Sequence, residues 1–366
     1  MQEIRIWEFE FSKDYFEPIK QIVRENNPFI STVSLDDVYS LEEYMLSDED
    51  TRLNVLLDNN IFTRLVYLSK GGVIQGTEEE IKTYRFCCAV MCFIVLGGFV
   101  IEPNIALYER ASKNTHLNAI QDIFNFRVAD HIHPMAYASL ALGLEERFSD
   151  EEIEKAKKLI NEDHLRIEES NFTKKLDDWK LIYLHLLKIF EINKSELNDT
   201  QKIQLFLEWI VKDCFSTQIS IIFALLIFSP KSSSMGTMIK NINSLNENKL
   251  KSGLKNAAWD LAYITKFIKL SKNQPENIIW FFCTHDKVLK KIARNLFLKD
   301  VQEIQVALNK LINEFWGRKK GDIVFLYYKK MSCSVTEHSE KRIQHNKNVR
   351  LKIDQMIEEL EFEVFF

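Results

Sequence analysis

Glycine and proline are scarce in this sequence, with 10 and 6 copies among 366 residues. Because these residues most often interrupt regular structure, their scarcity favours long helices joined by short loops. The most membrane-like run, residues 86–101, is too short to span a bilayer and is broken by Gly97-Gly98. The N-terminal MQEIRIWEFEF lacks the basic region and apolar core of a signal peptide. We therefore expect a cytoplasmic protein with no membrane partner.

The cysteines include no CxxC pair, which favours free thiols over disulfides or a zinc site. Most of them have apolar neighbours, which is typical of buried free thiols in a reducing compartment. The six are Cys87, Cys88, Cys92, Cys214, Cys283 and Cys333.

The charged residues are distributed unevenly along the chain. Hydrophobic residues make up 46% and charged residues 28%, which indicates a globular protein of one large or two ordinary domains. The formal net charge is −5, but residues 231–330 hold 19 Lys and Arg against 8 Asp and Glu. A basic segment within an acidic protein is a candidate nucleic-acid interface. Lysines that keep helix faces soluble explain the same count, so charge alone leaves both interpretations open.

Three short apolar runs each end in polar residues and then give way to a helical pattern. Their lengths and their content of Val, Ile, Leu or Phe are typical of buried strands. The runs with the polar residues that follow them are 53–57 with Asp58, 99–101 with Glu102, and 278–283 with Thr284-His285-Asp286. Repeated strand–helix units predict an α/β fold with a small parallel sheet and helices on both faces.

The rest of the chain is expected to be helical, above all from residue 118 to 228. A linker is predicted around Pro230, a last strand at residues 322–328 (DIVFLYY), and an amphipathic helix at 348–360. The predicted parts are the first portion of the α/β domain at 1–117, a helical insertion at 118–230, the second portion at 231–330, and a helical tail at 331–366.

Five carboxylates occupy positions from which they can face one site: Asp58, Glu102, Glu109, Asp260 and Asp286. The carboxyl ends of parallel strands share one edge of a sheet, and ligands of α/β proteins bind there. Clustered acids repel one another unless a cation neutralises them, and Mg²⁺ or Mn²⁺ prefers oxygen ligands. Two such ions activate water and stabilise the leaving oxygen in phosphodiester cleavage.

Each acid also has an ordinary structural interpretation. Asp58 and Asp286 stand where helix N-caps are expected. Glu102 suits a loop and Asp260 a solvated helix face, although Trp259 places Asp260 within an apolar segment. Both interpretations remain open for each of these acids.

The order of these features resembles that of the PIN-domain nucleases. The matching features are a strand ending in Asp58, an acid at Glu102 or Glu109, Asp260 in a helix, and a strand ending in Thr284-His285-Asp286. The resemblance covers residues 53–112 and 250–300. The long helical segment between the second and third acids departs from the compact family pattern.

The resemblance implies a PIN-like α/β/α sandwich that acts as a metal-dependent endoribonuclease on RNA, usually single-stranded. The catalytic acids that it implies are Asp58, Glu102 or Glu109, Asp260 and Asp286. Asp58, Asp260 and Asp286 would hold Mg²⁺ or Mn²⁺, with Asn59 and Thr284 in supporting roles. The family's second acid is usually a helical Glu, which favours Glu109, while Glu102 is equally well placed in the sequence.

Basic side chains accompany two of the implied metal ligands and would neutralise RNA phosphates. They are Lys255, Lys266, Lys287, Lys290, Lys291 and Arg294. For any single one of them, a solvated helix face is an equally simple explanation.

Two other classes of function remain open. Arg127, Asp130 and His133, in the segment RVADHIH, resemble the Arg–His signature of the HEPN ribonucleases, helical enzymes that cut RNA without metal. The other alternative is a non-catalytic helical interaction protein whose surface is the segment 118–228. In the nuclease hypothesis, the insertion would bind a protein regulator or form a homodimer, and the roles suggested by analogy are toxin, phage-defence or RNA-processing effector.

Overall fold

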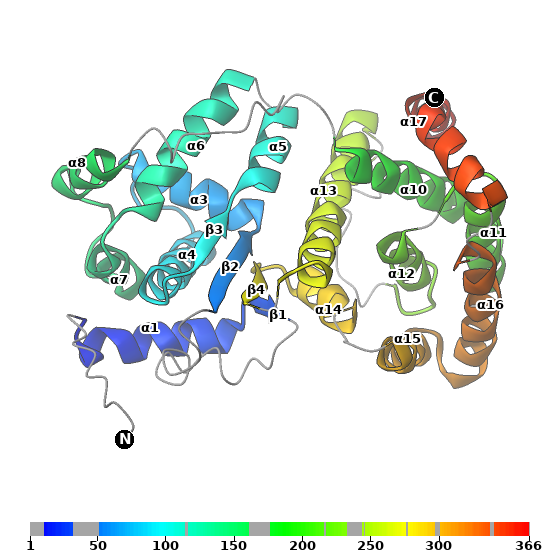
Figure 1. The fold of residues 1–366 in the computed structure, drawn as a ribbon, viewed down its shortest axis with the longest axis horizontal. Helices are drawn as coiled ribbons and strands as arrows, with labels where there is room; N and C mark the ends of the chain where they lie inside the picture. The colour runs from blue at the N-terminus through cyan, green and yellow to red at the C-terminus, as the bar shows by residue number, and fades with distance from the viewer. Residues whose placement is uncertain are drawn as a thin grey trace. The chain divides into compact units, whose positions relative to one another are not determined.

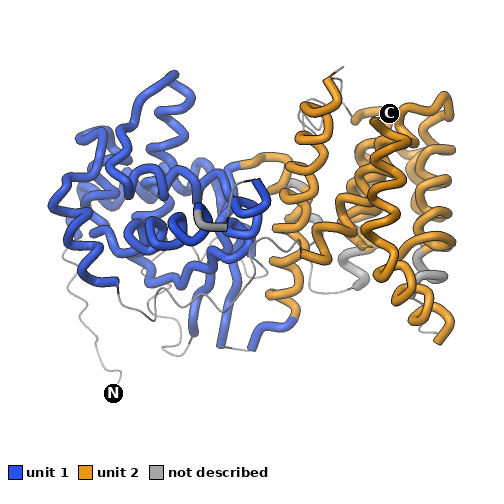
Figure 2. Tube along the Cα trace, turned by 90° about the horizontal axis from the view of Figure 1, so that it is seen from above, with its two compact units in different colours: residues 1–174, 273–285 blue, residues 175–272, 286–366 orange. Residues whose placement is uncertain are grey.

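The described part of the chain is mostly helical and contains one sheet of four strands (Figure 1). The computed structural model describes residues 11–31, 51–113, 116–160, 176–215, 217–232, 244, 246–275, 277–296, 301–336 and 340–365. The chain divides into two compact units, which Figure 2 shows in different colours. Unit 1 comprises Met1–Lys174 and Asn273–His285, and unit 2 comprises Lys175–Lys272 and Asp286–Phe366.

The sheet belongs to unit 1 and is mixed. Its strands are β1 (Phe29–Ser31), β2 (Arg52–Leu57), β3 (Val100–Glu102) and β4 (Ile278–Cys283). Their spatial order is β1-β4-β2-β3, and β2 runs parallel to both β3 and β4. The edge strand β1 pairs with β4 in the antiparallel direction. The predicted parallel pairing is therefore confirmed for three strands, and the sheet as a whole is mixed because of β1.

The register of the three parallel strands brings their carboxyl ends together. Leu56 of β2 lies opposite Glu102 of β3 and opposite Phe282 of β4. The residues that follow these strands therefore emerge at the same edge of the sheet, and they include Asp58 and Thr284.

Seven described helices belong to unit 1. They are α1 (Lys13–Asn26), α3 (Asn59–Ser69), α4 (Glu78–Leu96), α5 (Asn104–Lys113), α6 (His116–Asp130), α7 (Pro134–Leu142) and α8 (Asp150–Leu159). Thr77 and Glu80 form a capping box at the start of α4, and residues 86–94 of this helix are all buried where it packs against α1 and α7. This burial accounts for the long apolar run. No helix among the described residues is both long and apolar enough to cross a membrane.

Aromatic side chains fill one part of the sheet's core. Phe281 of β4 is fully buried, with its ring centroid 5.4 Å from that of Phe99 and 6.2 Å from that of Phe29. The Phe29 ring in turn lies 5.8 Å from that of Phe93 in α4. These contacts join β1, β4 and α4, so the short edge strand β1 is held by packing as well as by its backbone hydrogen bonds.

The regular elements of unit 2 are all helices within its described residues. Its helices are α10 (Asp177–Lys194), α11 (Asp199–Lys212), α12 (Gln218–Ile227), α13 (Glu247–Lys272), α14 (Lys287–Leu296), α15 (Val301–Trp316), α16 (Arg318–Thr336) and α17 (Glu340–Phe365). The helix α10 packs against α13 and α17. At the first of these contacts the ring centroids of Trp179 and Trp259 lie 5.4 Å apart.

The predicted strand at residues 322–328 is wrong, because this segment lies within α16. Its apolar residues alternate between core and solvent with a helical rather than a strand period. Val324 is 1% exposed, whereas its neighbour Ile323 is 57% exposed and Leu326 is 66% exposed. Aromatic and β-branched residues are typical of strands, which is why this short run predicts one. Tertiary packing overrides that local preference and makes the segment helical.

The two units divide the chain differently from the predicted parts. The segment 118–230 is helical where it is described, as predicted, but α6, α7 and α8 belong to unit 1 and α10, α11 and α12 to unit 2. Within residues 231–330, only Asn273–His285 belongs to unit 1. The prediction for the cysteines is confirmed for the five that are described, which are free and buried: Cys87, Cys88, Cys92, Cys214 and Cys283. The side chain of Cys333 lies outside the described residues.

The substitution Phe281→Ala should lower the opening free energy of the β2 and β4 amides by about 3–5 kcal/mol, because it leaves a cavity among Phe29 and Phe99. Hydrogen–deuterium exchange measures this quantity for unit 1 alone. The control Val100→Ala removes a 39% exposed side chain from β3 and should cost less than about 1 kcal/mol. Equal effects of the two substitutions would contradict the described core.

Candidate functional site

Asp58 is a buried carboxylate at the carboxyl end of the central strand β2. Its side chain is held on both oxygens: Oδ1 accepts a hydrogen bond of 2.6 Å from the backbone N–H of Asn60, and Oδ2 accepts one of 2.6 Å from Thr284 Oγ1. Its own backbone N–H donates to the Cys283 carbonyl at 3.0 Å. Asp58 is 4% exposed and Thr284 is 0% exposed. The carboxylate is therefore fixed by the ends of two neighbouring parallel strands.

Asp58 is also the N-cap of α3, so the structural interpretation of this residue is confirmed. Capping and ligand binding do not exclude each other, because each carboxylate oxygen has two lone-pair directions. The hydrogen bonds from Asn60 and Thr284 stabilise a negative charge that burial disfavours. They also restrict the direction in which the remaining lone pairs point, as a cation site requires.

The first two turns of α3 add polar groups beside Asp58. Asn59 Oδ1 accepts a hydrogen bond of 3.1 Å from Thr63 Oγ1. Arg64 Nη1 donates to the Asn60 carbonyl at 2.9 Å, and the Arg64 guanidinium lies 5.5 Å from the centre of the Tyr84 ring. Its Nε is buried and has no hydrogen-bond partner among the described residues. Sequence reasoning missed Arg64, although its spacing of four from Asn60 already placed it on the same helix face.

The thiol of Cys87 in α4 and the ring of His285, which follows Thr284, lie among apolar groups. Burial, above all, raises the pKa of the Cys87 thiol to about 12, while the charge of Arg64 opposes this shift and that of Asp58 adds to it. Cys87 therefore remains a thiol near neutral pH and is unsuited to act as a nucleophile. The His285 ring lies 4.5 Å from the ring of Phe86 in α4.

The two candidates for the second acid have different surroundings. Glu102 Oε1 accepts a hydrogen bond of 3.2 Å from the backbone N–H of Asn104, at the start of α5. Glu109 is 5% exposed and its Oε1 forms an ion pair of 2.6 Å with Lys113 one turn later. Both acids belong to unit 1, as Asp58 does.

Asp260 and Asp286 belong to unit 2. Asp286 is the exposed first residue of this part of the chain, and its Oδ1 accepts the backbone N–H groups of Val288 and Leu289 at 2.7 and 2.9 Å, so it caps α14. Asp260 is half-buried in α13, next to the buried Trp259. The predicted acids are thus divided between the units, and within the described residues no group of three His, Cys, Asp or Glu side chains is placed to hold a metal ion.

The predicted RNA-binding side chains all belong to unit 2. Lys266, Lys287 and Arg294 are exposed, whereas Lys255 and Lys290 are half-buried. Lys255 Nζ lies 5.8 Å from the centre of the Tyr183 ring. The Lys291 side chain lies outside the described residues.

The HEPN-like residues have structural contacts in unit 1. Arg127 pairs with Asp130 at 3.1 Å, and His133 is the N-cap of α7, where its Nδ1 accepts the backbone N–H of Met135 at 3.2 Å. His131 Nδ1 lies 2.8 Å from the Arg127 carbonyl. Each of these side chains stabilises a helix end or a turn, so none of the contacts favours the metal-free mechanism.

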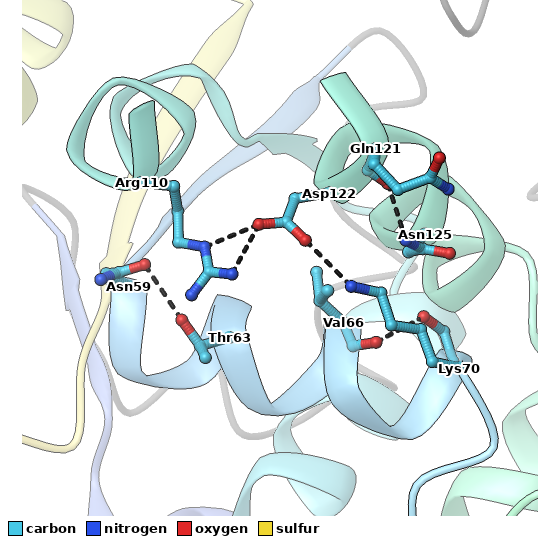
Figure 3. A network of polar contacts seen from close by, with 9 residues as sticks. Asn59, Thr63, Val66, Lys70, Arg110, Gln121, Asp122 and Asn125 are labelled. Atoms are coloured by element: carbon cyan, nitrogen blue, oxygen red, sulfur yellow. Dashed lines mark hydrogen bonds and ion pairs between the residues drawn. The ribbon is translucent and has the colours of Figure 1, made fainter. Parts of the chain in front are cut away.

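A buried polar network joins α3 to the two helices that follow β3 (Figure 3). The carboxylate of Asp122 in α6 is 3% exposed and pairs with Arg110 of α5 at 2.6 Å and with Lys70 of α3 at 3.1 Å. Arg110 Nε also donates to it at 2.7 Å. Figure 3 shows these groups beside Asn59 and Thr63 on α3, the helix that Asp58 caps. The network fixes the position of α3 relative to α5 and α6.

The substitution Thr284→Val should lower the free energy of unfolding by about 2 kcal/mol, because it removes a hydrogen bond to a buried charged group. Urea denaturation of the full chain measures this loss. The control Thr284→Ser keeps the hydroxyl and should retain most of the stability. If Ser and Val at this position are equally destabilising, the hydroxyl contact to Asp58 is not what stabilises the strand ends.

The substitution Asp122→Asn should cost about 2–3 kcal/mol of stability, because it leaves the Arg110 guanidinium without its buried counter-charge. The effect should appear as faster hydrogen exchange in α3, α5 and α6. Glu151→Gln is the matched control, since it removes one partner of the exposed Glu151–Lys155 pair in α8 and should leave exchange close to that of the wild type. A stability unchanged by Asp122→Asn would contradict the structural role of the network.

The geometry at the carboxyl edge of the sheet therefore consists of one oriented, buried carboxylate, Asp58, which Thr284 and the backbone N–H of Asn60 hold. One cation of the same helix, Arg64, donates to the Asn60 carbonyl. Comparisons with protein-family models, curated proteins and solved structures find no match for the chain.

Proposed function

We propose that the protein is a metal-dependent endoribonuclease with a PIN-like arrangement of acids, in which Asp58 is the central metal ligand. The observation that carries this proposal is the 2.6 Å hydrogen bond from Thr284 Oγ1 to Asp58 Oδ2. It places a buried carboxylate at the ligand-binding edge of a parallel strand pair and gives it a supporting hydroxyl.

The topology of unit 1 supports the proposal. The strand that precedes Asp58 is flanked on both sides by parallel strands, β3 and β4. β3 ends in Glu102, and β4 is followed directly by Thr284. Crossover connections between parallel strands bring their carboxyl ends to one edge, where loops and helix starts build sites. A PIN-like α/β/α sandwich is the finer fold that we propose for this unit.

Asp58, Asp260 and Asp286 are the proposed ligands of Mg²⁺ or Mn²⁺, with Glu102 or Glu109 as an additional acid. Asp58, Glu102 and Glu109 belong to unit 1, and Asp260 and Asp286 belong to unit 2. Asp286 follows Thr284 by two residues, which limits the separation of their Cα atoms to about 7 Å. A bound ion of this kind lowers the pKa of a coordinated water and stabilises negative charge on a phosphoryl oxygen.

RNA is the proposed substrate because basic groups accompany the acids on both units. The Arg64 guanidinium donates to the carbonyl of Asn60, two residues after Asp58, and Lys287 and Arg294 are exposed on the helix that Asp286 caps. Such groups would neutralise phosphates and orient a scissile phosphodiester. A cytoplasmic toxin, phage-defence or RNA-processing effector is the biological role that we propose by analogy, with unit 2 as the surface for a regulator or a second copy.

The test is cleavage of labelled single-stranded RNA by the full-length protein with Mg²⁺, with Mn²⁺ and with EDTA. Asp58→Asn and Asp286→Asn should lower the metal-dependent rate by at least about a hundredfold, because each removes a metal ligand. Thr284→Val should lower it by about 10–100-fold through the orientation of Asp58. Glu145→Gln, an exposed acid of unit 1 outside the site, is the control and should leave the rate unchanged.

A parallel titration with Mn²⁺ makes the outcome decisive. A wild-type protein that binds no Mn²⁺ and cleaves no RNA would contradict the proposal. Cleavage that persists in EDTA and survives Asp58→Asn would also contradict it, and would direct attention to Arg127 and His133.

A further inference from the structure

Unit 2 contains a cavity that is separate from the proposed metal ligands. Its volume is about 370 Å³, and residues of α10, α12, α13 and α17 line it. Small-molecule sites in proteins occupy about 300–1,000 Å³, so this cavity suits a small metabolite rather than a nucleotide-sized ligand. The four helices that line it come from both ends of the unit's sequence.

One wall of the cavity is apolar. Leu181 of α10, Ile219 of α12, Ile268 of α13 and Ile353 of α17 contribute to it. Leu181, Ile219 and Ile353 are buried and Ile268 is half-buried. A ligand that fills this space therefore needs an aliphatic or aromatic portion, whose burial would provide the main favourable free energy of binding.

A guanidinium among the lining residues lies against an aromatic ring. The Arg350 guanidinium lies 5.2 Å from the centre of the Phe215 ring, and both residues line the cavity. Among the described residues, this guanidinium forms no hydrogen bond or ion pair. Stacking on a ring holds the plane of the guanidinium while its N–H donors remain available to a carboxylate.

The other charges of the lining are two carboxylates and a lysine. Lys269 Nζ binds Asp178 at 2.7 Å on Oδ1 and 2.6 Å on Oδ2, so these two charges neutralise each other. Asp177, the first residue of α10, forms no hydrogen bond or ion pair with the described residues. Its ordinary role is to complement the helix dipole at the α10 N-terminus. The lining is thus left with one available cation, Arg350, and one available anion, Asp177.

We propose that this cavity binds a small zwitterion with an apolar body, of the size of a hydrophobic amino acid. The ligand's carboxylate pairs with Arg350, its ammonium group pairs with Asp177, and its side chain packs against Leu181 and Ile353. A simple organic anion would satisfy Arg350 but would meet the uncompensated carboxylate of Asp177. A simple amine would satisfy Asp177 but would leave the positive charge of Arg350 uncompensated. A ligand that carries both charges matches the lining best.

The test is calorimetric titration of the full-length protein with L-phenylalanine and with L-leucine. Two analogues of phenylalanine separate the charges: the methyl ester lacks the carboxylate, and the N-acetyl derivative lacks the ammonium group. We expect each analogue to bind at least about tenfold more weakly than the free amino acid, since each loses a charge-assisted hydrogen bond.

Two variants locate the binding. Arg350→Gln should weaken phenylalanine binding at least about tenfold and abolish the discrimination against the methyl ester. Asp177→Asn should abolish the discrimination against the N-acetyl analogue. Lys352→Gln is the matched control, because Lys352 is an exposed cation of the same helix outside the cavity lining.

Direct contact with the ligand predicts that each variant loses its discrimination against one analogue only. General damage to the fold would weaken the binding of all the ligands alike. A wild type that binds neither amino acid would overturn the proposal, as would unchanged selectivity in both variants. The result is independent of RNA cleavage, so it stands or fails separately from the proposed nuclease activity.

Discussion

The buried hydrogen bond between Thr284 and Asp58 depends on two segments that are 226 positions apart in the chain. A carboxylate removed from water needs partners, and Asp58 finds them in the hydroxyl of one strand end and the first turn of its own helix. This bond can form only if β4 inserts beside β2 in parallel register, with Leu57 opposite Cys283. The sheet and the candidate site are therefore consequences of the same pairing.

That pairing also determines how the chain is shared between the units. The chain leaves unit 1 after Lys174, contributes the described helices α10 to α13 to unit 2, returns for Asn273–His285, and leaves again at Asp286. The start of α14 at Lys287 therefore follows the end of β4 at Cys283 by only a few residues. A change in the ends of β4 would act on Asp58 through Thr284 and on unit 2 through Asp286.

Local patterns predicted the elements whose partners are close in sequence or whose burial is nearly complete. The strands at β2 and β4 and the helix α4 follow from short apolar runs and caps, and α4 begins and ends where its capping acids and Gly97 indicate. The antiparallel strand β1 and the helix at residues 322–328 depend on distant packing, which a sequence window does not contain. The capping roles of Asp58 and Asp286 were predictable, and the contacts of Glu109 with Lys113 and of Arg64 with Asn60 follow from a spacing of four residues in a helix. The geometry of the hydrogen bond from Thr284 to Asp58 depends on the pairing of β2 with β4, which no sequence window contains. Caps and metal ligands use the same oxygen atoms, which is why neither the sequence nor the hydrogen bonds distinguish them.

The most direct measurement is a crystal structure of the protein soaked in Mn²⁺, with anomalous diffraction recorded at the manganese edge. The proposed function predicts an anomalous peak at about 2.1 Å from a carboxylate oxygen of Asp58. The same soak of Asp58→Asn should show no peak there. Manganese bound only at other sites, with Asp58 still held by Asn60 and Thr284, would contradict the proposal and leave Asp58 as a buried helix cap.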